Sequence, residues 1–147
     1  MRQESLGLLW LGEFQYGLSQ RGVSVLTAGE LRWVRPYGLL PHPNHTGGYL
    51  AVATLACTGW ILTERRWVRW IGTVLFWWGL YGLLLTFSRS AWIGFAAGGL
   101  FLLVYMAQPL REQATIRRQT IITMLGAAVI GWLFTVQYTP LVLARTV

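Results

Sequence analysis

From residue 46 onward, four long apolar stretches alternate with short polar segments rich in arginine. The stretches cover residues 46–63, 70–87, 91–110 and 120–136, and none of them contains a charged side chain. A helix needs about 20 mostly apolar residues to cross a hydrocarbon core roughly 30 Å thick. The pattern therefore predicts an all-α integral membrane fold with four transmembrane helices. Since only Ser88-Arg89-Ser90 joins the second and third stretches, these two helices should form a tight antiparallel pair.

Small residues at helical spacing indicate where these helices approach one another. Gly94 and Gly98 form a GxxxG pair in the third stretch, and Ala127 and Gly131 have the same spacing in the fourth. In a membrane, small side chains let helix backbones come close together, and this contact stabilises the packing. We therefore expect both pairs to lie at helix–helix contacts.

The first 45 residues show shorter patterns. Within residues 5–20, apolar side chains fall near one helical face that Glu13 interrupts, which predicts a short interfacial helix. The end of an upstream helix is the alternative interpretation. Residues 23–26 and 31–34 are typical of two short strands around a turn.

The segment at residues 35–45 contains three prolines and one glycine, so it predicts non-helical but ordered backbone at the membrane edge. It ends where Asn44 or Thr46 is placed to cap the first transmembrane helix. The chain is thus interpreted as three parts. Residues 1–45 form an extracytoplasmic, interfacial segment, residues 46–136 form the transmembrane region, and residues 137–147 begin an extracytoplasmic loop.

Arginine positions set the expected orientation. Each side of the membrane would receive six arginines, but those closest to the spans lie on the side that holds the loops at 64–69 and 111–119. Cytoplasmic loops carry an excess of positive charge near the ends of the spans. This favours a cytoplasmic location for these loops and places both chain termini outside the cytoplasm. The topology and headgroup arginines are Arg65, Arg66, Arg69, Arg111, Arg117 and Arg118.

Composition excludes several other classes of protein. Only 12% of the residues are charged, against roughly a quarter in soluble proteins, so the chain could not cover a soluble surface. The net charge is +7, but the arginines form short clusters between apolar runs, which argues against nucleic acid as a partner. Cys57 is the single cysteine and lies within an apolar run, so we expect it to pack as a small apolar residue.

The first and third transmembrane helices would both begin on the same outer side. Helix N-termini carry unpaired N–H groups and a partial positive charge, and both favour anions. Arg35 and Arg89 lie near these two starts, with Ser88 beside Arg89, and arginine suits bidentate phosphate binding. The pattern predicts a diphosphate cradle at the outer membrane surface. The alternatives are that Arg89 extends to the interface at a turn and that Arg35 is an ordinary loop arginine.

Other polar side chains near this cradle have simpler interpretations. His42 and His45 have HxxH spacing, but no carboxylate or thiol lies nearby, so no metal site is expected. We expect His42 either to be structural or to contact phosphate. Glu30 is the carboxylate nearest in sequence; a solvated surface role is favoured over a role as general base.

Two segments resemble one known family. Residues 35–52 read RPYGLLPHPNHTGGYLAV, which resembles the Arg, Gly and His-Pro-Asn signature before a transmembrane helix in O-antigen ligases and Wzy-type O-antigen polymerases. Residues 84–94 read LLTFSRSAWIG, similar to the Ser-Arg turn between the next two helices of that family. The resemblance covers about residues 35–134, and the order of the elements carries more weight than either motif.

The resemblance implies a multi-pass glycosyltransferase in the bacterial inner membrane, with its active face outside the cytoplasm. Such enzymes move a glycan from an undecaprenyl-diphosphate carrier to a lipid or glycan acceptor, without a nucleotide sugar, a cofactor or an essential metal. Carried over to this chain, Arg35, Arg89 and Ser88 would bind the carrier diphosphate, and His42 and Asn44 would shape the pocket.

The catalytic residues are not identified in this chain, because family members carry their proposed catalytic histidine in a long loop after the equivalent of residue 136. We therefore expect a partial enzyme that is inactive alone; whether its parent is a ligase or a polymerase stays open. A non-enzymatic membrane protein, such as an assembly or lipid-binding accessory, is the competing hypothesis. A transporter is disfavoured because neither internal repeats nor broken helices are evident.

Overall fold

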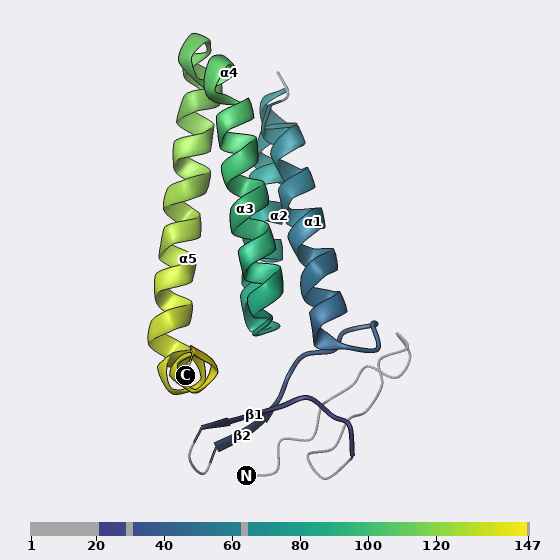
Figure 1. Cartoon of the computed structure of the whole chain (residues 1–147). Helices are drawn as coiled ribbons and strands as arrows, with labels where there is room; N and C mark the ends of the chain where they lie inside the picture. The colour runs from purple at the N-terminus through teal and green to yellow at the C-terminus, as the bar shows by residue number, and fades with distance from the viewer. Residues whose placement is uncertain (1–20, 29–30, 63–64, 147) are drawn as a thin grey trace.

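The computed structural model describes residues 21–28, 31–62 and 65–146, so the interfacial helix expected at residues 5–20 lies outside the described residues. Within them, four helices run side by side and a two-stranded hairpin lies beneath one end (Figure 1). The elements in chain order are β1 (Val25–Ala28), β2 (Leu31–Val34), α1 (Pro43–Ile61), α2 (Arg66–Leu85), α3 (Arg89–Tyr105), α4 (Ala107–Glu112) and α5 (Ala114–Thr146).

The bundle has two distinct ends. At the hairpin end, β1 and β2 lie near the start of α1, and the α2–α3 turn is on the same side (Figure 1). At the opposite end, called here the arginine end, α2 begins at Arg66 and α5 begins at Ala114 after the short helix α4. The strands pair antiparallel with Val25 opposite Val34 and Leu26 opposite Trp33. The second strand has the expected bounds, whereas the first begins two residues later than the sequence predicted.

Helix α1 packs against both α2 and α3, and α5 packs mainly against α2. Glycines permit the closest approaches, because a Cβ atom at these positions would meet a neighbouring side chain. Gly72 lies against Trp60, Gly98 against Leu55 and Gly126 against Trp77.

Of the three glycines in the expected small-residue pairs, only one lies at a close helix–helix contact. Gly98 contacts α1, but a Cβ at Gly94 or at Gly131 would have nothing within 4 Å. Gly94 and Gly98 are about one turn apart on the same face of α3, so their spacing does not reveal which turn of that face comes closest to α1.

Two helices are long and apolar enough to cross a membrane: α2, and α5 over Ala114–Val142. In their most apolar stretches, only 22% and 17% of the residues, respectively, are buried. A core helix of a soluble protein would be mostly buried, whereas these helices expose large side chains such as Trp78, at 79%, and Trp132, at 65%. Large contiguous apolar surfaces mark contact with another apolar phase. The fold thus indicates membrane association.

Several helix boundaries differ from the sequence prediction. The third apolar stretch is divided: α3 ends at Tyr105, and α4 begins at Ala107. The loop expected around Arg117 and Arg118 is instead the first turn and a half of α5, because arginine and glutamine are good helix formers.

The segment expected to begin a loop at residues 137–147 is helical to Thr146. At Tyr138 the backbone leaves helical geometry (φ −114°, ψ 21°), and Pro140 follows. Since proline lacks the N–H that would bond to residue 136, it bends a helix. The Thr139 hydroxyl donates to the Val136 carbonyl at 3.3 Å and so partly replaces that bond.

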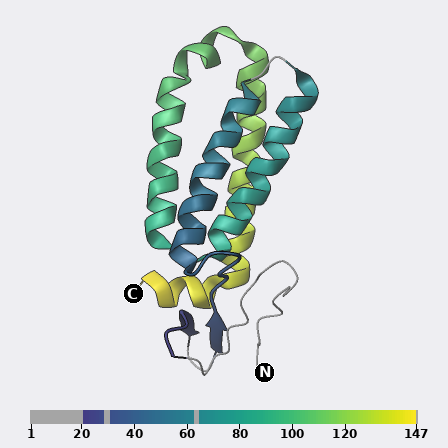
Figure 2. The same ribbon diagram turned by 90° about the vertical axis from the view of Figure 1, so that its right-hand side faces the viewer.

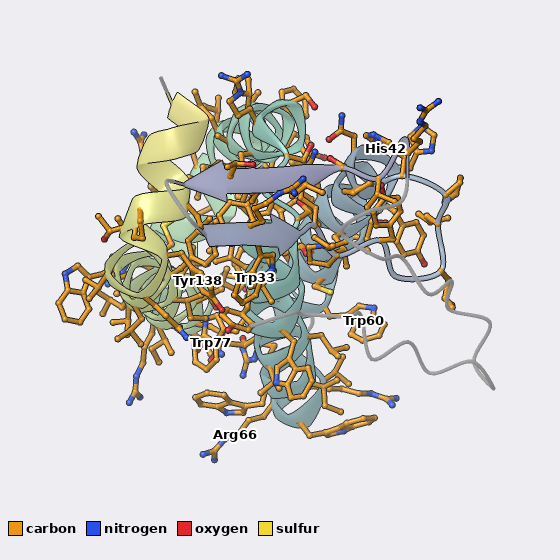
Figure 3. All side chains as sticks on the ribbon, turned by 90° about the horizontal axis from the view of Figure 1, so that it is seen from below. Trp33, His42, Trp60, Arg66, Trp77 and Tyr138 are labelled. Atoms are coloured by element: carbon orange, nitrogen blue, oxygen red, sulfur yellow. The ribbon has the colours of Figure 1, made fainter. Side chains whose placement is uncertain are left out.

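After the kink, the end of α5 runs across the hairpin end, above the strands (Figure 2). This arrangement closes a small apolar core formed by Leu26, Phe87, Phe134 and Leu141. The rings of Trp33 and Tyr138 are 6.0 Å apart and meet edge to face (Figure 3). The hairpin is thereby fixed to the helices.

Candidate anion site at the hairpin end

Arg35 lies directly after β2 and is almost completely buried, with 2% of its surface exposed. Its guanidinium group donates hydrogen bonds to three different parts of the chain. Nε donates to the Thr86 carbonyl at 2.8 Å, Nη2 to Asn44 Oδ1 at 2.8 Å, and Nη1 to Ser24 Oγ at 3.1 Å. Arg35 therefore links the hairpin to the start of α1 and to the end of α2.

The start of α1 is shaped by the proline-rich segment. His42, and not Asn44 or Thr46, is the N-cap: its Nδ1 accepts a hydrogen bond from the Asn44 backbone N–H at 3.1 Å. The two residues expected to cap have other partners. Asn44 accepts from Arg35, and the Thr46 hydroxyl donates to the Tyr37 carbonyl. The cap forms two residues before Asn44 because Pro43 suits the first helical position, where a missing N–H costs nothing.

Tyr37 connects the proline-rich segment to the residues before β1. Its ring is buried, and its hydroxyl accepts a hydrogen bond from the Ser24 backbone N–H at 2.7 Å. Ser24 also accepts from Arg35 through its side chain, so the hairpin and the proline-rich segment share one hydrogen-bonded unit. Residues 35–42 are non-helical, as the prolines predicted, but the expected non-helical segment is three residues too long, because α1 already begins at Pro43.

The α2–α3 turn has the expected length of three residues, but it covers residues 86–88 and not 88–90, because α3 already begins at Arg89. Phe87 joins the two helices with φ +49°, a left-handed conformation that is unfavourable for a bulky side chain. The Phe87 ring is 1% exposed, and its centroid lies 5.3 Å from that of Phe134 and 5.9 Å from that of Tyr138. Burial of this ring offsets the cost of the backbone conformation.

Polar groups inside the turn have defined partners. The Thr86 hydroxyl donates to the Leu83 carbonyl at 2.7 Å, and Trp92 Nε1 donates to the same carbonyl at 3.2 Å. Carbonyls at a helix C-terminus lack intrahelical partners. Thr86 and Trp92 satisfy one of these carbonyls, and Arg35 satisfies that of Thr86.

Helix α3 begins without a side-chain cap. Ser88 is its N-cap and makes no capping hydrogen bond; its Oγ lies 3.3 Å from that of Ser90. Ser88 is buried, whereas Arg89 and Ser90 are exposed. In the part of the chain that the structure describes, the Arg89 side chain has no hydrogen bond or ion pair. The first turn of α3 thus contains uncapped N–H groups, a pair of neighbouring hydroxyls and an exposed arginine, a combination that favours an anion.

The structure brings the two predicted clusters to the same end of the bundle. Arg35 bonds to Thr86, two residues before Ser88, and a Cβ on Gly47 of α1 would lie 3.0 Å from Ser88 Cβ. The roles differ, however. Arg35 is engaged within the protein and positions the surrounding backbone, while Arg89 is available to a ligand. Ligand binding by Arg35, Arg89, Ser88, His42 and Asn44 remains a prediction.

Some residues of this site were not foreseen from the sequence. Tyr37 and Ser24 had no motif to distinguish them, and Thr86 contributes a backbone carbonyl that any residue could supply. Phe87 also gave no signal, because left-handed backbone is usually marked by glycine. The described residues contain no group of three or more His, Cys, Asp or Glu side chains that could hold a metal ion.

An apolar cavity of about 320 Å³ lies farther along the bundle, toward the arginine end. Leu55 and Ile61 of α1, Leu102 of α3 and Thr120 of α5 are among its lining residues. The Thr120 hydroxyl is buried without a hydrogen-bond partner in the described residues. The cavity marks the gap between α3 and α5, which do not pack directly against each other.

Comparison of the chain with protein-family models, with curated proteins and with solved structures gave no match. The functional argument therefore depends on this chain's own residues.

Proposed function

We propose that the chain is part of a membrane glycosyltransferase similar to O-antigen ligases, and that its hairpin end binds an undecaprenyl-diphosphate-linked glycan. One observation supports the proposal above all. The arginine and His-Pro-Asn segment and the Ser-Arg turn carry the resemblance to that family, and they meet at one end of the bundle through the bond from Arg35 to Thr86. Two motifs more than one helix apart in the sequence are thus close enough in space to serve one site, which supports the proposal.

Arg89 is the proposed diphosphate ligand. It is exposed at the first position of α3, next to N–H groups that have no side-chain cap. Its planar fork can donate two parallel hydrogen bonds to phosphate oxygens. Ser90 contributes a second exposed donor one residue later.

Arg35, His42 and Asn44 position this site in the proposal. Arg35 holds the end of α2 and the start of α1 together, and His42 caps α1 beside them. A buried guanidinium also places a positive charge close to the α2–α3 turn. That charge adds to the attraction for an anion without direct contact.

The chemistry of the proposed site is electrostatic. When a glycan leaves its carrier, the C1–O bond breaks and negative charge develops on the carrier diphosphate. Donors held in place around that diphosphate stabilise the charge as it forms. The acceptor, a lipid or a second glycan, and the base that activates it are outside this proposal.

The proposal places four transmembrane helices in the bacterial inner membrane, with the hairpin end outside the cytoplasm. Helices α1 and α3, of 19 and 17 residues, would then cross beside the longer α2 and α5. The hairpin, with Arg32 exposed on β2, would lie at the outer headgroups.

Binding to the carrier tests the proposal. The chain is reconstituted in phosphatidylcholine nanodiscs, and its affinity for undecaprenyl diphosphate is measured by titration. We expect Arg89→Gln to weaken binding at least about tenfold, since a charge-assisted hydrogen bond contributes roughly 1.5–3 kcal/mol. Arg111→Gln removes the same charge at an exposed position of the arginine end and should bind as the wild type does.

Equal binding by wild type and Arg89→Gln would contradict the proposal. It would favour the second candidate, a non-enzymatic membrane protein in which Arg35 stabilises the fold and Arg89 extends into the headgroups. The three hydrogen bonds that Arg35 donates within the protein favour this second candidate, because they give Arg35 a structural role without any ligand.

A further inference from the structure

A second site lies at the arginine end, away from the proposed diphosphate site. A pocket of about 350 Å³ opens between the start of α2 and the start of α5. Three arginines line it: Arg66 and Arg69 from α2, and Arg118 from α5. Viewed along the bundle, Arg66 lies at its periphery (Figure 3). The pocket is thus built from segments about 50 residues apart in the chain.

The three guanidinium groups have no neutralising partner among the described residues. Within residues 21–28, 31–62 and 65–146, none of their side chains makes a hydrogen bond or ion pair. No carboxylate of the residues that the structure describes lines the pocket. Three like charges around one pocket repel each other unless an anion lies between them. The pocket therefore has the electrostatic character of an anion site.

Gln119, which lines the pocket, belongs to a buried polar network that fixes the two helices. Gln119 Nε2 donates to Thr73 Oγ1 at 2.8 Å, and the hydroxyls of Thr73 and Thr123 are 3.4 Å apart. All three side chains are buried, and Trp77 Nε1 donates to the Thr123 carbonyl at 3.0 Å. Gly126 lets the Trp77 ring pack directly on α5. Because the helices cannot separate freely, the arginines above them are held near one another.

The remaining lining points to the kind of ligand. Trp70 and Ile122 give the pocket an apolar side, continuous with the exposed apolar surface of two helices suited to a membrane. Tryptophan is typical of the interface between headgroups and acyl chains. A ligand with a negative headgroup and an apolar body would match both the arginines and this apolar side. Basic pockets between membrane helices are known to bind anionic lipid headgroups.

We propose that the Arg66–Arg69–Arg118 pocket binds the phosphate group of an anionic phospholipid. The three arginines donate to the phosphate oxygens, and Trp70 and Ile122 contact the first part of the acyl chains. The site differs from a general attraction of basic loops to a charged surface, since it requires arginines from two helices around one phosphate. It is also independent of the proposed function at the hairpin end.

The test measures the thermal unfolding midpoint of the chain in dodecyl maltoside as a lipid is added. Phosphatidylglycerol should raise the midpoint in a saturable manner, because a ligand that binds only the folded state stabilises it. Phosphatidylcholine should not. The double variant Arg69→Gln/Arg118→Gln should require at least about tenfold more phosphatidylglycerol for the same shift.

A matched double variant, Arg111→Gln/Arg117→Gln, removes the same charge from exposed positions of the same end outside the pocket. It should respond as the wild type does. If it loses the response as fully as the pocket variant, the attraction is general and the proposed site is wrong. If inorganic phosphate raises the midpoint and phosphatidylglycerol does not, the pocket binds a soluble phosphate and the lipid assignment is overturned.

Native mass spectrometry keeps the proposal testable if the pocket variant is unstable. One phosphatidylglycerol should remain on the wild-type chain, and on Arg66→Gln alone its retention should fall several-fold. Arg111→Gln is the reference and should retain the lipid as the wild type does. Equal retention of phosphatidylglycerol by the wild type and Arg66→Gln would contradict lipid binding in the pocket.

Discussion

The guanidinium of Arg35 donates from Nε to the backbone carbonyl of Thr86 at 2.8 Å, across 51 residues of sequence. This bond joins a segment that precedes the first helix of the bundle to the last turn of the second. It also satisfies a carbonyl at the end of α2, where intrahelical partners are absent. The hairpin end is consequently a single hydrogen-bonded unit and not a set of separate loops.

Replacement of Arg35 should therefore lower stability. Arg35→Lys retains the charge but loses the Nε donor and the planar fork, so the carbonyl of Thr86 and the amide of Asn44 cannot both keep a partner. We expect a loss on the order of 3 kcal/mol in the free energy of unfolding, measured by denaturation in detergent. Arg32→Lys, an exposed position on β2, is the control and should change stability little. A similar stability for both variants would contradict this role.

Phe87 provides a test of backbone strain. Phe87→Ala removes the buried ring but keeps the left-handed backbone at an unfavourable residue, whereas Phe87→Gly removes both the ring and the unfavourable contact of Cβ. Both variants should be less stable than wild type. The glycine variant should be the more stable of the two by roughly 1 kcal/mol, the reverse of the order in helix interiors. Thermal unfolding of the pair checks this, and an alanine variant at least as stable as glycine would show that no strain is stored there.

The polar network between α2 and α5 should be cooperative. Thr73→Val and Gln119→Leu each remove one partner of the 2.8 Å hydrogen bond. A double-mutant cycle on the unfolding free energy should give a coupling of about 0.6–1.5 kcal/mol, the range for hydrogen bonds between membrane helices and for ordinary buried ones. Additive effects would mean that the two side chains stabilise the fold separately.

Topology is tested by labelling in intact cells. On a Cys57→Ser background, Ser90→Cys places a thiol at an exposed position of the hairpin end, and Arg117→Cys places one at the arginine end. A membrane-impermeant maleimide should label residue 90 in intact cells and residue 117 only after lysis. The opposite result would invert the proposed orientation and place the Arg89 site in the cytoplasm.

The regular parts of this fold were predictable, because apolar length and polar interruptions are local properties of the sequence. They predicted the helices of the bundle, a connection of three residues between α2 and α3, and the second strand, although the connection lies two residues earlier than expected. The helical start of α5 through Arg117 and Arg118 was missed, since charge was interpreted as loop although arginine is compatible with helix. The helix after the Tyr138 kink was also missed, because its stability depends on packing against the hairpin.

The sequence predicted that Arg35 and Arg89 lie at the same end of the bundle, but not the different roles of their side chains. Motif order placed Arg35 and Arg89 at the same end, yet burial and bonding separate them into a positioning residue and an exposed one. The His42 cap replaced the expected caps because Asn44 is engaged by Arg35. Such roles depend on partners distant in sequence, which a local pattern does not contain.

The affinity ratio between undecaprenyl diphosphate and undecaprenyl monophosphate, measured for wild type and Arg89→Lys in nanodiscs, is decisive for the hairpin-end site. Wild type should prefer the diphosphate, and Arg89→Lys should reduce that preference about tenfold, because lysine keeps the charge but loses the bidentate fork. An unchanged ratio in Arg89→Lys, or no preference in the wild type, would contradict diphosphate recognition by Arg89.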